Sequence, residues 1–202
     1  MGCLPGSRSG DSCIVLASTW FLAKPWDRSR RGCRRCSSTE ETLPHVLNHC
    51  MRYSAAYQSR HNAVMDRVHK AAGSRWNLLS ANQVFPGTNL RPDLVLCKDR
   101  SAIVIDVTIS FENRLSAFSS AREDKITKYR PVVDLLKRDF ADVRSYAFVV
   151  GSLGAWDKEN DKLLRRLCSN KYANLLRKLV VSETIRYSRN IYVEHLTGIR
   201  QM

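Results

Sequence analysis

Three cysteines and a histidine near the start of the chain constrain its folding more than any other feature. Cys33, Cys36, His45 and Cys50 are spaced as C-x2-C-x8-H-x4-C. Zinc takes thiolate and imidazole ligands in tetrahedral geometry, and a two-residue gap lets one tight turn present two sulfurs to one ion. His45 and Cys50 fall on one face of a short helix expected over residues 42–50. The spacing predicts a CCHC zinc knuckle over residues 33–52, a segment that the metal would stabilise.

Two other interpretations of this segment stay open. The cysteines can be free buried thiols without a metal, and His49 can replace His45 as the nitrogen ligand. The chain has seven cysteines among 202 residues, and these do not form an obvious disulfide framework. This cysteine usage favours a reducing compartment and metal ligation.

The charge of the chain is strongly positive. Lys and Arg total 33 against 19 for Asp and Glu, which gives a formal net charge of +14. Such a charge attracts polyanions and sustains binding to phosphate backbones. Arg31, Arg34 and Arg35 would make the predicted knuckle a basic contact surface for nucleic acid. The apolar run from residue 13 to residue 23 is too short to span a membrane, and we expect no membrane partner.

The remaining chain alternates helical and strand patterns. We expect residues 1–32 to be a poorly ordered basic lead-in. The predicted elements are a helix over 52–72, a strand over 76–85, hairpin strands over 93–97 and 102–109, a helical region over 113–140, a strand over 146–150 and helices over 158–195. Pro131 is expected to kink the helical region, and a break is expected at 169–170. This order predicts an α/β sandwich with a mixed central sheet.

Two aspartates carry the predicted chemistry. Asp93 opens the first hairpin strand and Asp106 follows the apolar run of the second, with 12 residues between them. An antiparallel hairpin of this length can bring both carboxylates to the same end of the sheet. Mg²⁺ would neutralise them and take phosphate oxygens and water as its other ligands. The alternative is a turn aspartate and a surface-paired aspartate, but an unpaired carboxylate in a buried strand is costly.

The motifs in order resemble a known family. They are CxxC–H–C, Arg60-His61-Asn62, Arg91-Pro92-Asp93, Val104-Ile105-Asp106-Val107-Thr108 and Lys125-Ile126-Thr127-Lys128-Tyr129. From about residue 33 to 202 the chain resembles the C-terminal region of non-LTR retrotransposon polyproteins. The most similar group carries a restriction-like endonuclease and includes elements that insert into ribosomal RNA genes.

The resemblance implies a PD-(D/E)XK restriction-endonuclease-like fold for residues 53–202, with C-terminal helices. Asp93 and Asp106 then correspond to its two metal-binding acids. The usual lysine two residues after the second acid is replaced by Thr108. Members of this group supply a lysine from the following helix instead, so Lys125 or Lys128 is the candidate catalytic lysine. The alternative is that both lysines face solvent.

Three further residues are expected at the nucleic acid. They are Arg60, Arg91 and Tyr129, although solvent exposure is the alternative for Arg60 and simple packing for Tyr129. His61 is a less favoured general base, and we expect it to lie at the surface or to contact a backbone.

The predicted function is a Mg²⁺-dependent endonuclease that nicks double-stranded target DNA to prime reverse transcription during retrotransposon insertion. The expected location is the nucleus. The element's RNA is a second candidate partner, and the reverse transcriptase region normally lies upstream in the same polyprotein. No polymerase signature is visible in this chain. The main alternative is an inactive zinc-containing nucleic-acid-binding module derived from such an element. A stand-alone repair nuclease is a third interpretation, against which the knuckle argues.

Overall fold

The computed structural model describes residues 32–38, 40–113 and 116–201. The predicted lead-in, with Arg31 and the apolar run, lies outside the described residues except for Gly32. The described elements are η2 (His45–His49), η3 (Met51–Tyr53), α2 (Ser54–Ala72), η4 (Gly73–Arg75), β1 (Asn77–Ala81), β2 (Leu94–Lys98), β3 (Ser101–Ser110), α3 (Ser116–Lys128), α4 (Arg130–Leu136), β4 (Asp142–Gly151), α5 (Asn160–Leu167) and α6 (Asn170–Thr197).

Four strands form one mixed sheet in the order β1-β2-β3-β4. The predicted hairpin is confirmed, because β2 pairs with β3 antiparallel, with Leu94 opposite Ile105 and Lys98 opposite Ser101. β1 is antiparallel to β2, whereas β4 runs parallel to β3. A parallel neighbour needs a crossover connection, and α3 and α4 supply it. The prediction of an α/β fold with a mixed sheet flanked by helices is therefore confirmed.

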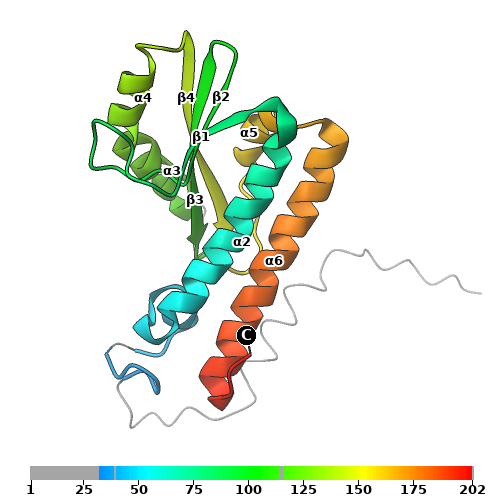
Figure 1. Cartoon of the computed structure of the whole chain (residues 1–202). Helices are drawn as coiled ribbons and strands as arrows, with labels where there is room; N and C mark the ends of the chain where they lie inside the picture. The colour runs from blue at the N-terminus through cyan, green and yellow to red at the C-terminus, as the bar shows by residue number, and fades with distance from the viewer. Residues whose placement is uncertain (1–31, 39, 114–115, 202) are drawn as a thin grey trace, which may run out of the picture.

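Both faces of the sheet are covered, which explains why its central strands are apolar throughout. On one face, Ile103, Ile105 and Val107 of β3 pack with residues of α2, α5 and α6. On the other face, Ala102 and Val104 pack against α4 and Tyr129. Figure 1 shows α3 and α4 on one side of the sheet and α2 with α6 on the other. Alternation along β3 thus decides which helices each side chain meets.

Two strand boundaries differ from the prediction. The strand expected over 76–85 ends at Ala81, because Asn82 has a φ of 50° and turns the chain away from the sheet. A register irregularity between Leu78 and Ser80 also interrupts its pairing with β2. β4 begins at Asp142, before the expected start at residue 146. None of its first residues is fully buried, so no apolar run marks them in the sequence.

The helical region expected over 113–140 is divided into α3 and α4. The break falls at Tyr129, and Pro131 lies in the first turn of α4. Proline fixes φ and lacks an N–H, so it fits a first helical turn better than a helix interior. The predicted interruption at Pro131 is confirmed. The Tyr129 side chain, at the break, is buried in the core.

The 28-residue helix α6 joins the sheet layer to the segment that precedes α2. α2 and α6 lie side by side in Figure 1, and Arg67 of α2 pairs with Glu183 of α6 at 2.8 Å. Ile191, near the end of α6, is buried with Val46, Leu47 and Tyr53. Among the described residues, no helix is both long enough and apolar enough to cross a bilayer.

Candidate functional site

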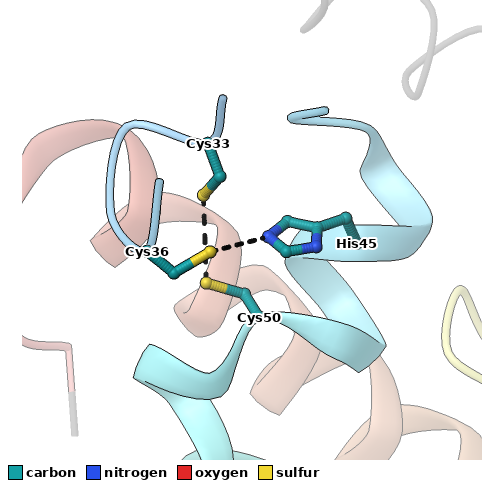
Figure 2. Close-up of side chains that lie close together, drawn as sticks. All are labelled: Cys33, Cys36, His45 and Cys50. Atoms are coloured by element: carbon teal, nitrogen blue, oxygen red, sulfur yellow. Dashed lines mark hydrogen bonds between the residues drawn. The ribbon is translucent and has the colours of Figure 1, made fainter. Parts of the chain in front are cut away.

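Cys33, Cys36, His45 and Cys50 form a compact cluster, called here the cysteine–histidine cluster. Their Sγ atoms and one imidazole nitrogen all lie within 4.8 Å of one another, and Figure 2 shows the four side chains pointing toward a common centre. Cys33 Sγ is 3.9 Å from Cys50 Sγ, and Cys36 Sγ is 3.3 Å from His45 Nε2. The structure therefore brings together the four residues that the spacing predicted, and His49 stays exposed.

Local backbone hydrogen bonds bring the ligand atoms together. The N–H of Ser37 donates to the carbonyl of Cys33 at 2.8 Å and closes the first turn. The N–H of Cys50 donates to the carbonyl of His45 at 2.7 Å and closes the wide turn of η2. Cys33 and Cys50 are buried. A thiolate set with one imidazole is the donor set that structural zinc prefers, so this cluster could bind zinc.

The thiols differ in acidity. A hydrogen bond to Ser38 lowers the pKa of Cys36 to about 6, whereas burial raises the pKa of Cys50 to about 12. Metal ligation needs the thiolate form, so a divalent cation would have to displace the proton of the buried Cys50.

A separate cleft of about 480 Å³ lies at the end of the β2–β3 hairpin. Asp93 and Asp106 both line it. The paired register reaches Leu94 opposite Ile105, so Asp93 and Asp106 are the next residues beyond this pair on the two sides of the hairpin. Asp93 is 8% exposed and Asp106 is 4% exposed. Asp93 Oδ2 accepts a hydrogen bond from the N–H of Val107 at 2.6 Å, which ties the two strand ends together.

Both candidate lysines line the same cleft. Lys125 Nζ lies 2.8 Å from Asp106 Oδ2. Lys128 Nζ instead lies over the ring of Tyr129, 4.9 Å from its centroid. The geometry thus separates the two lysines, since Lys125 contacts an acid and Lys128 contacts an aromatic face at the cleft wall.

His61 also reaches the acids, although the sequence favoured a surface or backbone role. Its Nε2 lies 3.0 Å from Asp93 Oδ2 and 3.1 Å from the carbonyl of Val107. Burial opposes protonation of the ring, but hydrogen bonding to Asp93 and its charge outweigh burial and raise the pKa of His61. His61 is spaced from Val64 and Val68 so that all three lie on the same side of α2, where the two valines are buried. This spacing is the signal that could have placed His61 inward.

Two of the expected nucleic-acid contacts occupy different places. Arg60 is 2% exposed, and its guanidinium donates to the carbonyl of Leu47 and to Ser188 Oγ, both at 2.8 Å. Tyr129 is 1% exposed and donates to the carbonyl of Arg91 at 2.9 Å. Burial raises the pKa of Tyr129, as does the neighbouring Asp106. These contacts do not favour a phosphate contact for either residue, because their polar groups already join parts of the protein.

The remaining basic residues stay nearer the surface. Arg34 Nε pairs with Glu41 at 2.6 Å, and Arg35 Nε donates to the carbonyl of His195 at 2.8 Å. Arg91 is exposed at the cleft rim, and its Nε donates to the carbonyl of Asn82. Arg31 lies outside the described residues.

Glu112 is half-buried and anchors a loop, a role that the sequence did not reveal. Its carboxylate accepts hydrogen bonds from the N–H groups of Leu153 and Ala155, at 2.8 and 3.0 Å. It thereby fixes the turn that follows β4. Gly151 lies so close to this carboxylate that a Cβ there would overlap it.

Together these features define an α/β protein in which two acids at the end of a sheet hairpin and a lysine of α3 share one cleft, beside a cluster that could bind zinc. No protein-family model matches the chain. It is similar to the Retrovirus-related Pol polyprotein from type-1 retrotransposable element R2 of Popillia japonica, with 28% identity over 153 residues, which cover 72% of this chain and 32% of that protein. It is also similar to the Retrovirus-related Pol polyprotein from type-2 retrotransposable element R2DM of Drosophila melanogaster, with 28% identity over 142 residues, which cover 66% of this chain and 13% of that protein. The matches therefore span a third or less of these relatives, and they support an origin in a non-LTR retrotransposon.

Proposed function

We propose that this chain is a DNA endonuclease domain that nicks double-stranded DNA by Mg²⁺-dependent hydrolysis of a phosphodiester bond. The observation that carries the proposal is the cleft that Asp93 and Asp106 both line, with Lys125 Nζ at 2.8 Å from Asp106 Oδ2. Two acids at neighbouring strand ends, with a lysine beside them, are the arrangement expected of a PD-(D/E)XK nuclease over residues 53–202.

The acids suit a hard divalent cation. Mg²⁺ prefers carboxylate oxygens and keeps several water ligands, and the cleft is open enough to admit both water and phosphate. Asp93 Oδ2 accepts from the N–H of Val107 and Asp106 Oδ2 contacts Lys125, and a carboxylate has about four acceptor sites, so these contacts orient the acids and leave acceptor sites for a cation. Asp93 and Asp106 would hold the ion, and its chemistry when bound would be to polarise the phosphate and acidify water.

The other residues of the cleft have separate tasks in this proposal. Lys125 holds Asp106 in place and offsets the negative charge that develops on the phosphate. His61 holds Asp93 from the side opposite Lys125. Lys128 and Arg91 attract the neighbouring phosphates of the same strand, which positions DNA without reading its sequence.

The cysteine–histidine cluster has a structural task in this proposal. Zn²⁺ bound there would fix residues 33–52 as a knuckle that presents Arg34 and Arg35 to DNA. The net charge of +14 supports the same partner.

The similarity to Pol polyproteins of R2 elements suggests the setting of the reaction. We infer that the nick leaves a 3′ hydroxyl from which a reverse transcriptase region of the same polyprotein primes synthesis. The chain would then act in the nucleus on target DNA, with the element's RNA as a further partner.

Nicking of supercoiled plasmid by the purified chain tests the proposal. With Mg²⁺, we expect conversion to the open-circular form by the parent protein and not by Asp106→Asn. The matched control is Asp99→Asn, which removes an exposed carboxylate from the turn of the same hairpin and should leave nicking unchanged. DNA binding is measured for all three proteins, so that a folding defect is recognised.

A parent protein that binds DNA but nicks it in neither Mg²⁺ nor Mn²⁺ would overturn the nuclease assignment. The chain would then be an inactive nucleic-acid-binding module. Equal nicking by the parent and Asp106→Asn would remove the acid pair from the mechanism.

A further inference from the structure

Three buried ligand-type side chains meet beside the cysteine–histidine cluster. Cys33, Glu41 and His195 each offer one ligand atom, and the three atoms lie within 4.8 Å of one another. Cys33 is 1% exposed, Glu41 8% and His195 0%. His195 comes from the last turn of α6, so this group joins the beginning of the described chain to its end.

The hydrogen bonding of His195 does not account for its position. Its Nε2 lies 3.2 Å from Glu41 Oε1, at the distance of an ion pair. Within the described part of the chain, its Nδ1 is buried and has no hydrogen-bond partner. A buried polar group without a partner is costly. The ring is also fixed by Tyr53, whose centroid lies 5.7 Å away, so the nitrogen atoms are held where they are.

The three donors suit a borderline-soft divalent cation. Thiolate, carboxylate and neutral imidazole are the three ligand types that bind zinc in proteins. The Glu41 carboxylate accepts from the N–H of Arg34 at 2.7 Å and from Arg34 Nε at 2.6 Å. A carboxylate has about four acceptor sites, so these two bonds orient Glu41 and leave sites for an ion, as outer hydrogen bonds do around metal ligands.

We propose that Cys33, Glu41 and His195 bind a second zinc ion, with the Cys33 thiolate shared between this ion and the ion of the cysteine–histidine cluster. The proposal rests on the zinc assignment of that cluster and is independent of the nuclease assignment. Three thiolates and one carboxylate supply four negative charges, which two divalent cations balance. The pair of ions would fasten residues 33–50 to the C-terminal end of α6, where Arg35 already donates to the carbonyl of His195.

Counting zinc ions in the whole chain tests the proposal. The protein, without a tag, is loaded with zinc, desalted and weighed by native mass spectrometry. We expect two ions on the parent chain, one on His195→Ala, and two on the control His49→Ala, which removes an exposed imidazole next to the cluster. One ion on the parent overturns the proposal, and so do two ions on His195→Ala, because the second ion would then lie elsewhere.

A second measurement keeps the proposal testable if His195→Ala does not fold. X-ray absorption at the zinc edge of the parent protein should show a zinc neighbour at about 3.5–4 Å, the spacing of two-metal sites. Sulfur, nitrogen and oxygen shells without a zinc neighbour would overturn the shared thiolate. Neither measurement depends on DNA cleavage, so failure here is distinct from failure of the proposed nuclease.

Discussion

Lys125 Nζ lies 2.8 Å from Asp106 Oδ2, so a lysine of α3 contacts an aspartate of β3. The lysine side chain is 30% exposed and the carboxylate 5%. Ion pairs with an exposed partner contribute little to stability, and the lysine of this pair is partly exposed at the wall of the cleft. Its main consequence is therefore local, because it places one positive charge beside the acid pair and fixes the direction in which Asp106 points.

Replacing Lys125 should reduce cleavage more than replacing Lys128. We expect Lys125→Met to lower the plasmid nicking rate about 100-fold, the typical effect of removing a group that stabilises transition-state charge. Lys128→Met removes a cation of the same cleft that contacts Tyr129 rather than an acid, and it should lower the rate less than tenfold. Single-turnover rates at saturating DNA make the comparison. Equal losses in the two variants would contradict the assignment of Lys125.

The two arginines of the cleft should differ in their contribution to DNA binding. Arg91 is exposed at the rim, so Arg91→Met should reduce the slope of log affinity against log salt by about 0.9, the value for one phosphate contact. Arg60 is buried, so Arg60→Met should leave that slope unchanged. A reduced slope for Arg60→Met would restore the phosphate contact that the sequence suggested.

Arg60 should instead contribute to stability. Its guanidinium joins α2 to the carbonyl of Leu47 and to Ser188 of α6, and burial lowers its pKa to about 10. Arg60→Met leaves the Leu47 carbonyl without this donor, so we expect a loss of about 2 kcal/mol in the free energy of unfolding. Ser188→Ala removes one of these bonds without removing the charge and should cost about 1 kcal/mol. Urea unfolding measures both, and an Arg60→Met protein as stable as the parent would contradict this role.

The sequence predicted the features that depend on local spacing. The hairpin follows from two apolar runs and a short turn, and the nearness of Asp93 and Asp106 follows from their places next to the pair Leu94–Ile105. The convergence of four ligands follows from the spacing of Cys33, Cys36, His45 and Cys50. In both cases, the residues that meet lie on one short piece of chain, so the backbone geometry of that piece is sufficient.

The features that the sequence missed depend on contacts between distant segments. His61 meets Asp93 only because α2 crosses the end of β3, and Glu112 meets Leu153 only because β4 returns beside β3. Arginine is a residue type that usually lies at the surface, but α6 covers Arg60. The metal-ligand role of Asp93 and Asp106, the PD-(D/E)XK assignment and the nuclear location stay predictions.

Gly151 should accept a side chain only when Glu112 moves away. A Cβ at this position would overlap the Glu112 carboxylate, which accepts hydrogen bonds from the N–H groups of Leu153 and Ala155. We expect Gly151→Ala to lower the free energy of unfolding by about 1 kcal/mol, because displaced Glu112 gives up its bonds to these exposed donors, which then bind water. Glu112→Ala makes room for the methyl group, so Gly151→Ala should cost clearly less in that background. Equal costs in the two backgrounds would show that Glu112 is not the cause.

Removal of zinc should loosen the cluster and then one wall of the cleft. The segment between His45 and Cys50 contacts the strand at the cleft through Asn48, whose side chain donates to the carbonyl of Ile109 at 2.8 Å. A chelator selective for zinc over magnesium removes the ion without emptying a magnesium site. The amide of Val46 donates to the carbonyl of Thr42 and that of Cys50 to the carbonyl of His45, and we expect both to exchange at least tenfold faster in deuterated water. The amides of Ile103 and Ile105, in the centre of the sheet, should keep their protection because no cluster residue contributes to their pairing.

Cys36→Ser should reproduce the faster exchange without a chelator. Unchanged exchange at Val46 and Cys50 in both experiments would mean that packing against α6 alone holds this segment, and that zinc is not part of its stability.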